Sequence, residues 1–235
     1  MSRLWSTMRW DWQLQWRQGL FYAALFVMLA WIGLFLQLDD LITHYLLPVI
    51  LYIDLSIFGF FFMAGLLYLE KGEGVLSALV VTPLQGWRYL VAKLVTLTGI
   101  GLLVSLSVVI VVHRAAVNWP LLVGALILNS LFFILASFIL ACRYDAINEF
   151  LIPAIWFLGA AQIPFLDSFG IWSGWLIYLL PFQAALLLVR GAFEPLAAWQ
   201  WLYALTYLLA MIGAGFVWSL RAFQHFVVRG AGGKQ

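Results

Sequence analysis

Charged residues are scarce in this sequence: 9% of its 235 residues are Asp, Glu, Lys or Arg, and 66% are apolar. A soluble domain is typically about 25% charged and about half apolar. So few polar groups cannot cover the surface of a soluble monomer or keep a chain disordered in water, which excludes both classes. The net charge is +2 without a basic stripe, which also excludes a nucleic-acid binder.

Cysteine and catalytic motifs are scarce as well. Cys142 is the single cysteine, so an intramolecular disulfide is excluded and we expect a buried, inert thiol. The sequence lacks the G-x-x-x-x-G-K-[ST] motif, and its Gly-rich tail at 230–234 lacks the Ser or Thr, so we expect no P-loop for ATP. His44, His113 and His225 do not have metal-ligand or general-base spacing, and no two carboxylates are evident at one depth. We therefore expect no catalytic residue, metal or cofactor in this chain.

Long apolar runs are what the sequence has in abundance. A helical span needs about 20 apolar residues, and the runs are continuous rather than alternating, which excludes a β-barrel. The predicted spans are residues 19–38, 45–69, 90–112, 121–142, 150–166 and 199–220. The sequence therefore predicts an all-α polytopic membrane protein with six transmembrane helices in a single domain, 1–235.

The distribution of Lys and Arg predicts the orientation, because cytoplasmic loops retain these residues. With the N-terminus inside, ten of them lie in inner segments and two, Arg114 and Arg190, in outer segments. The inner set is Arg3, Arg9, Arg17, Lys71, Arg88, Lys93, Arg143, Arg221, Arg229 and Lys234. We expect a multi-pass protein of the inner (plasma) membrane with both termini cytoplasmic.

The N-terminal stretch, residues 1–18, has a helical pattern of its own. Trp5, Met8, Trp12 and Trp16 recur at spacings that place them on one helical face, while most polar residues lie elsewhere. Trp favours the headgroup layer, so we expect an amphipathic helix lying on the inner leaflet. It acts either as a plain anchor for the first span or as an elbow that transmits motion from a cytoplasmic partner.

The predicted outer segment 167–198 is too apolar for a solvated loop. It contains two apolar pieces, 171–180 and 182–189, each about half a span long and separated by Pro181. This pattern predicts a re-entrant pair of short helices that dips in from the outer face. Pro181 and Arg190 are the candidate residues of an outer gate.

Polar residues inside the predicted spans are few. Asp54 lies about 13 Å deep in the second span, and an intramembrane carboxyl is a functional candidate by default. Asn129 in the fourth span and Gln162 in the fifth are further candidates for a substrate path. The alternative for Asp54 is a structural hydrogen bond to a neighbouring helix.

The cytoplasmic segment 70–89 combines charge, glycine and an apolar piece. Glu70, Lys71 and Glu73 leave the second span beside Gly72 and Gly74, which permit a sharp exit. A helical apolar piece at 75–81 follows, with Leu76 and Leu79 on one face, and Thr82-Pro83 ends it. Such a segment covers either the bilayer or a groove on a partner, with the three charges at its rim.

The segment resembles the permeases of type-2 ABC exporters, the drug, lipid and glycan export class. The matching residues are Glu70, Lys71, Glu73, Gly74, Leu76, Ala78, Leu79, Val81, Thr82, Pro83 and Leu84. Gly72 and Ser77 depart from the usual acidic residues and Val75 from the usual Thr. Among subfamilies, the chain is most similar to the small permeases of drug-export operons, including those for fluoroquinolones.

The resemblance implies a half-size permease that moves a hydrophobic or amphipathic, drug-like or lipid-like substrate outward. The expected partners are a second permease subunit, identical or paralogous, membrane lipid, and an ATP-binding cassette ATPase that holds ATP and Mg. The residues expected to couple to that ATPase are Glu70, Lys71, Gly72, Glu73, Gly74, Leu76, Leu79, Thr82 and Pro83.

Three other functions compete with this interpretation. A haem-export permease of cytochrome maturation is a plausible relative within the same class. An ATP-independent secondary carrier or channel is favoured only by Asp54, because carriers usually show several ionisable residues or broken helices at mid-membrane. A membrane enzyme or an assembly factor is the third alternative, and we find no group of catalytic residues in the sequence that supports it.

Overall fold

The structure, a computed structural model, describes residues 2–74, 86–113, 117–170 and 174–232. These residues form helices and turns, without a strand in the described ranges. The elements are α1 (Ser2–Arg17), α2 (Leu20–Phe35), α3 (Asp40–Gly72), α5 (Gly86–Val112), α6 (Trp119–Ala141), α7 (Ile147–Ala161), α8 (Phe165–Ser168), η1 (Trp175–Leu179), α9 (Pro181–Arg190) and α10 (Ala198–Gly232).

Five stretches are long and apolar enough to cross a membrane: α3, α5, α6, α7 continued to Asp167, and α10 up to Gln224. A sixth span results if the bent pair Met8–Arg17 and Leu20–Phe35 counts as one. By itself α2 has 16 residues, or about 24 Å of helix, against an apolar core of about 30 Å. The predicted all-α polytopic class is confirmed.

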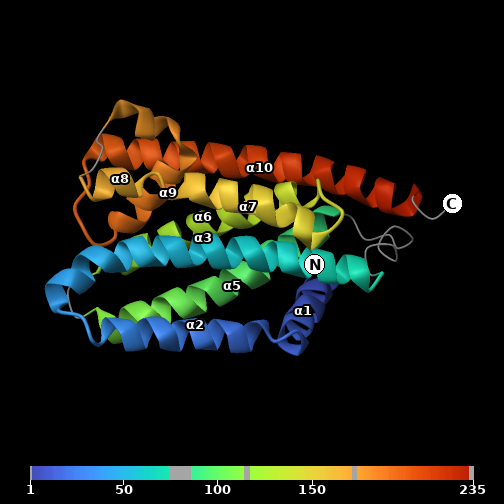
Figure 1. Cartoon of the computed structure of the whole chain (residues 1–235), viewed down its shortest axis with the longest axis horizontal. Coiled ribbons are helices and arrows are strands. Elements are labelled where there is room, and N and C mark those ends of the chain that lie inside the picture. The colour runs from blue at the N-terminus through green and yellow to red at the C-terminus, as the bar shows by residue number, and fades with distance from the viewer. Residues whose placement is uncertain (1, 75–85, 114–116, 171–173, 233–235) are drawn as a thin grey trace.

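Helix α1 turns away from the bundle at Gly19. The axes of α1 and α2 differ by 69°, so α1 lies across the end of the bundle (Figure 1). Gly19 has φ +79°, a left-handed conformation that glycine adopts without a Cβ clash. Trp12 and Trp16 of α1 flank Phe21 with ring centroids 4.8 and 5.0 Å away. The elbow is therefore held by an aromatic cluster, while its placement on a leaflet stays a prediction.

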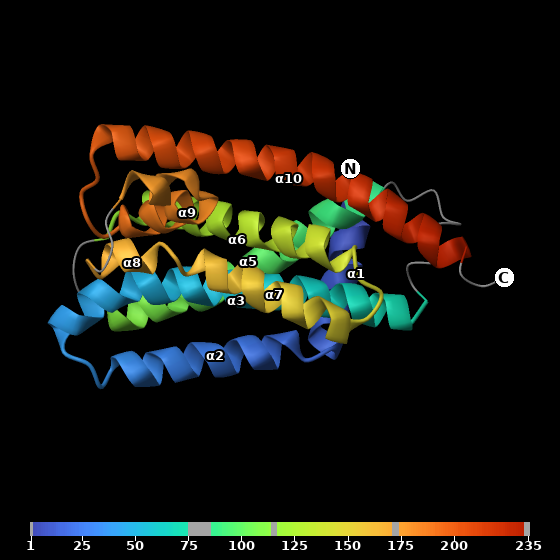
Figure 2. The ribbon, with the colours of Figure 1, turned by 45° about the horizontal axis from the view of Figure 1, so that its top comes forward.

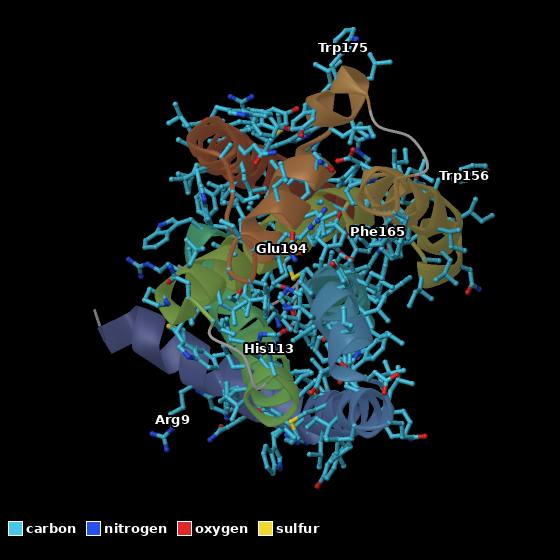
Figure 3. The ribbon with its side chains drawn as sticks, turned by 90° about the vertical axis from the view of Figure 1, so that its left-hand side faces the viewer. Arg9, His113, Trp156, Phe165, Trp175 and Glu194 are labelled. Carbon is cyan, nitrogen blue, oxygen red and sulfur yellow. The ribbon has the colours of Figure 1, made fainter. Side chains whose placement is uncertain are left out.

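The core of the molecule is built around α3 and α6, which pack along each other. Tyr52, Phe60 and Phe133 are completely buried between them and their neighbours. In contrast, α7 and α10 are mostly exposed (Figure 2), and Trp156 of α7 points away from the bundle (Figure 3). In a membrane protein such apolar faces meet lipid or another subunit.

The fifth predicted span, 150–166, is not one helix. Helix α7 ends at Ala161, turns at 162–164 intervene, and α8 restarts at Phe165. Pro164 explains the break, because proline has no amide hydrogen for the helical ladder and disfavours a helical residue before it.

The predicted pair of short outer elements corresponds to η1 and α9. The first is a single 3-10 turn, shorter than the predicted 171–180, and residues 171–173 lie outside the described part of the chain. Leu180 is extended, as favoured before a proline, and Pro181 opens α9 at its first turn. Residues 182–189 of α9 are all buried against α3, α6 and α10. Backbone at membrane depth must be covered by protein, and α9 meets that condition.

Candidate functional site

One end of the bundle gathers most of the charged residues. The N-terminal helix α1, the last turns of α3, the first turns of α5 and the C-terminal part of α10 all lie at this end (Figure 1). The orientation prediction placed these segments on one side of the membrane, and the structure does bring them together. That this side is cytoplasmic stays a prediction.

A buried ion cluster joins three of these helices. The Nζ of Lys93 in α5 lies 2.5 Å from Oδ1 of Asp11 in α1 and 2.5 Å from Oε1 of Glu70 in α3. The exposed fractions are 1% for Lys93, 8% for Asp11 and 2% for Glu70. We call these three residues, with Gln15, Tyr89 and Thr96, the Lys93 cluster.

Neutral donors complete the cluster around its two carboxylates. The Tyr89 hydroxyl donates to Oε2 of Glu70 at 2.5 Å, and the Thr96 hydroxyl donates to Oδ2 of Asp11. The Gln15 amide donates to the same Oδ2 at 2.7 Å. Two carboxylates face one ammonium, so these donors stabilise the charge that Lys93 leaves uncompensated. Burial of a charged group is tolerated only when it is paired and hydrogen-bonded in this way.

The cluster corrects two expectations from the sequence. No pair of carboxylates was evident at one depth, yet Asp11 and Glu70 share Lys93. Glu70 was expected at the rim of the coupling segment, yet it points into the bundle from the last turns of α3. Sequence reasoning counted Lys93 only as an inner charge and gave Asp11 no role. Asp11 and Gln15 lie four apart on α1, which places them on one helical face, but the sequence does not indicate their contact with Lys93.

The other predicted coupling residues are divided between the described and undescribed parts. Lys71 forms a more exposed ion pair with Asp145 at 2.7 Å, linking α3 to the turn before α7. Gly72 closes α3, Glu73 is exposed, and Gly74 has φ +72°, a conformation suited to glycine. Leu76, Leu79, Thr82 and Pro83 lie outside the described residues.

The Lys93 cluster brackets the undescribed segment 75–85. Glu70 precedes the segment on α3, and Tyr89 and Lys93 follow it on α5. Both flanks of this segment are therefore joined through one buried node, in which Oε1 of Gln15 alone is without a hydrogen-bond partner among the described residues. Through Asp11 the same node holds α1.

The three candidates for a substrate path lie in different surroundings. Asp54 is part-buried on α3, and its Oδ1 accepts a hydrogen bond of 3.1 Å from Nε1 of Trp31 on α2. Asn129 is fully buried in α6, without a hydrogen-bond partner for its amide among the described residues. Gln162 caps α7 and donates to the Leu158 carbonyl at 3.1 Å. Only Asp54 therefore combines a charge with partial access.

The opposite end of the bundle holds the predicted outer gate. Arg190 pairs with Glu194 at 3.1 Å, and Gln183 of α9 donates to Asp167 of α8 at 3.2 Å. Glu194 lies near the centre of this end, whereas Trp175 of η1 points outward (Figure 3). The structure thus ties α9 to its flanking segments, while a gating role for Pro181 and Arg190 stays untested.

Two histidines that are distant in sequence meet at this end. The rings of His44 and His113 stack with centroids 5.8 Å apart. Burial and the neighbouring His44 lower the pKa of His113 below its usual value. No group of three or more His, Cys, Asp or Glu able to hold a metal occurs among the described residues.

Comparison with known proteins identifies the family. The model of the fluoroquinolones export permease protein family matches residues 2–231. The chain belongs to this family. It is 33% identical over 236 residues to the fluoroquinolones export permease proteins MT2761 and Rv2687c of two Mycobacterium tuberculosis strains, with 99% of each chain covered.

No solved structure matches this export permease. The family match confirms the resemblance to exporter permeases that the segment 70–84 suggested. It also favours a transporter subunit over an enzyme, and a multi-pass membrane location for the permease.

Proposed function

We propose that this chain is the permease subunit of an ATP-driven exporter of type-2 ABC architecture. The observation that carries the proposal is the Lys93 cluster, which joins α1, α3 and α5 on both sides of the segment 75–85. An ATP-driven permease without a P-loop must receive energy from a partner, and the segment 75–85 is flanked on both sides by residues of this cluster. ATP and Mg belong to the partner ATPase.

The energy input is assigned to residues 70–84. Glu73 is exposed beyond the end of α3, where a partner can reach it, and Leu79 lies on the predicted apolar face. The charged rim then selects the ATPase, while the apolar face supplies the contact area. Glu70 is bonded to Lys93 of α5, which is bonded to Asp11 of α1. A movement of this segment would therefore also move α1 and α5.

The substrate path is assigned to the surface of α3 beside α2. Asp54 and Trp31 meet there, and Phe58 and Phe62 form an edge-to-face pair along the same helix. A carboxyl among aromatic rings suits an amphipathic, aromatic compound that carries a hydrogen-bond donor or a positive charge. The relatives are named for fluoroquinolones, and a drug of this kind is the proposed substrate.

A second permease subunit completes the proposed exporter. The apolar faces of α7 and α10 are mostly exposed, so a partner has surface to bind without disturbing the core. Two copies side by side, or one copy with a paralogue, then form the complete exporter.

Two substitutions in the segment 70–84 test the proposal. The chain is produced together with its ATPase, and Glu73→Lys and Leu79→Glu are compared with Asp39→Lys, a matched charge change at the opposite end of the bundle. We expect Glu73→Lys and Leu79→Glu to lose drug-stimulated ATP hydrolysis, co-purification of the ATPase, or both, while insertion is unchanged. Asp39→Lys should behave as wild type. Wild-type stimulation and ATPase recovery in both test variants would refute the assignment.

A further inference from the structure

A side pocket on α10 shares no lining residue with the proposed drug path or the Lys93 cluster. Its volume is about 790 Å³, within the usual range for small-ligand sites. It opens between the C-terminal end of α6 and the part of α10 that follows Gly213, two helices that pack together. The lining residues are Cys142, Arg143, Gly213, Ala214, Val217, Trp218, Arg221 and Ala222.

The pocket wall formed by α10 changes along the helix from small and apolar residues to a charged one. Gly213, Val217 and Arg221 are four residues apart and form one row, with Ala214, Trp218 and Ala222 as the row beside it. Each row begins with a small residue and continues with an apolar one. Arg221 then brings a charge about 12 Å further along the axis than Gly213.

Two guanidinium groups stand at the charged end of the pocket. Arg143 lies over the Trp218 ring, with its Cζ 5.4 Å from the centroid, and Arg221 is exposed. No carboxylate lies within ion-pair distance of either guanidinium in the described parts of the chain. The pocket therefore offers two uncompensated positive charges to a ligand.

We propose that this pocket binds an anionic phospholipid. It lies between two membrane helices, and two arginines are among its lining residues. The C-terminal part of α10 runs toward the end of the bundle that also holds α1 (Figure 1). Arg143 and Arg221 match the charge of a phosphate headgroup, and the strip from Gly213 to Val217 accommodates an acyl chain. Basic pockets between helices at a membrane surface are sites of this kind. A bound lipid bridges the end of α6 to α10.

The experiment measures lipid binding to the purified permease by native mass spectrometry. Phosphatidylglycerol is titrated against phosphatidylcholine with the same acyl chains. We expect wild type to retain phosphatidylglycerol preferentially. Arg143→Gln and Arg221→Gln should each weaken this binding about fivefold. Arg88→Gln is the matched control, because Arg88 also lies over a Trp ring, 5.4 Å from Trp87, but outside the pocket.

A second variant tests the apolar half without changing charge. A Cβ on Gly213 meets nothing within 4 Å, so the position has room for a side chain, and Gly213→Leu adds apolar bulk at the pocket wall and improves helix propensity. It should also weaken phosphatidylglycerol binding, and soluble glycerol phosphate should not compete with the lipid. Competition by glycerol phosphate alone would instead assign the site to a free phosphate.

Three results would overturn the proposal. Equal retention of the two lipids by wild type shows that the pocket does not select for a negatively charged headgroup. An equal loss in Arg88→Gln shows that binding depends on general positive charge. Wild-type phosphatidylglycerol binding in Arg143→Gln, Arg221→Gln and Gly213→Leu shows that the lipid binds outside the pocket. None of these readings requires transport activity, so they are independent of the proposed export function.

Discussion

At the scale of single residues, the Lys93 cluster decides how strongly the charged end of the bundle is held. Removal of one partner from a buried ion group leaves the other charges uncompensated, which costs about 3–5 kcal/mol. More exposed pairs such as Lys71 with Asp145 contribute only ~0–1 kcal/mol. We therefore expect substitution of Lys93 to affect stability far more than substitution of Lys71, although both lysines pair with carboxylates at the same end of the bundle.

We expect Lys93→Met to lower the free energy of unfolding by about 3–5 kcal/mol, because Asp11 and Glu70 remain buried as carboxylates. Unfolding in detergent, followed by circular dichroism, measures the change. Combining Lys93→Met with Asp11→Asn and Glu70→Gln should restore most of the loss. Lys71→Met is the control and should change stability by less than about 1 kcal/mol. Equal effects of the two lysine variants would show that the cluster is not a buried charge node.

A substitution at Asp54 distinguishes a role of its carboxylate in substrate binding from a purely structural role. If it binds substrate, Asp54→Asn should reduce drug transport about tenfold or more, because a hydrogen bond to a charged group contributes ~1.5–3 kcal/mol. Stability should hardly change, since hydrogen bonds between membrane helices average about 0.6 kcal/mol. Transport into vesicles and thermal unfolding measure the two effects. Asp39→Asn, at the exposed end of the bundle, is the control, and unchanged transport in Asp54→Asn would remove Asp54 from the path.

At the scale of elements, hydropathy predicted most helices well. The continuous apolar runs correspond to α2, α3, α5, α6, α7 with α8, and α10, and Pro181 correctly marked the start of α9. The break at Pro164 was missed because apolar residues continue on both sides of it. The burial of residues 182–189 in α9 was also not predictable, since hydropathy cannot distinguish a helix covered by protein from one covered by lipid.

The Lys93 cluster shows a second limit of sequence reasoning. Asp11, Glu70 and Lys93 lie on three helices, and their meeting depends on the 69° bend at Gly19 and on the packing of α1 on α5. A charge count places all three on one side of the membrane but says nothing about their contact. Local patterns therefore predicted the elements, and only the tertiary structure assembled the site.

The same elements make a prediction about topology. In a Cys142→Ala background, Ser168→Cys should react with a membrane-impermeant maleimide added outside the cell, because the segment 167–198 is expected to be external. Gly232→Cys should react only after the membrane is permeabilised. The ten-to-two distribution of Lys and Arg is the physical basis. External labelling at position 232 would contradict the proposed orientation.

At the scale of the whole molecule, the permease combines a buried core with two exposed helical faces and one charged end. The core of α3, α6 and α9 gives a fixed frame, while α7 and α10 leave surface for lipid or a second subunit. The charged end joins the expected ATPase contact to α1, α3 and α5 through one node. In the proposed mechanism, energy enters at the charged end of the molecule and the drug path lies at the side of α3.

The central claim is that this permease exports its substrate with energy from ATP. Everted membrane vesicles containing the permease and its ATPase are incubated with a fluorescent fluoroquinolone, and its accumulation inside the vesicles is followed directly. The account predicts accumulation that requires ATP, stops with vanadate and persists when a protonophore collapses the proton gradient. Accumulation driven by an imposed proton gradient, without ATP or the ATPase, would contradict it and identify a secondary carrier.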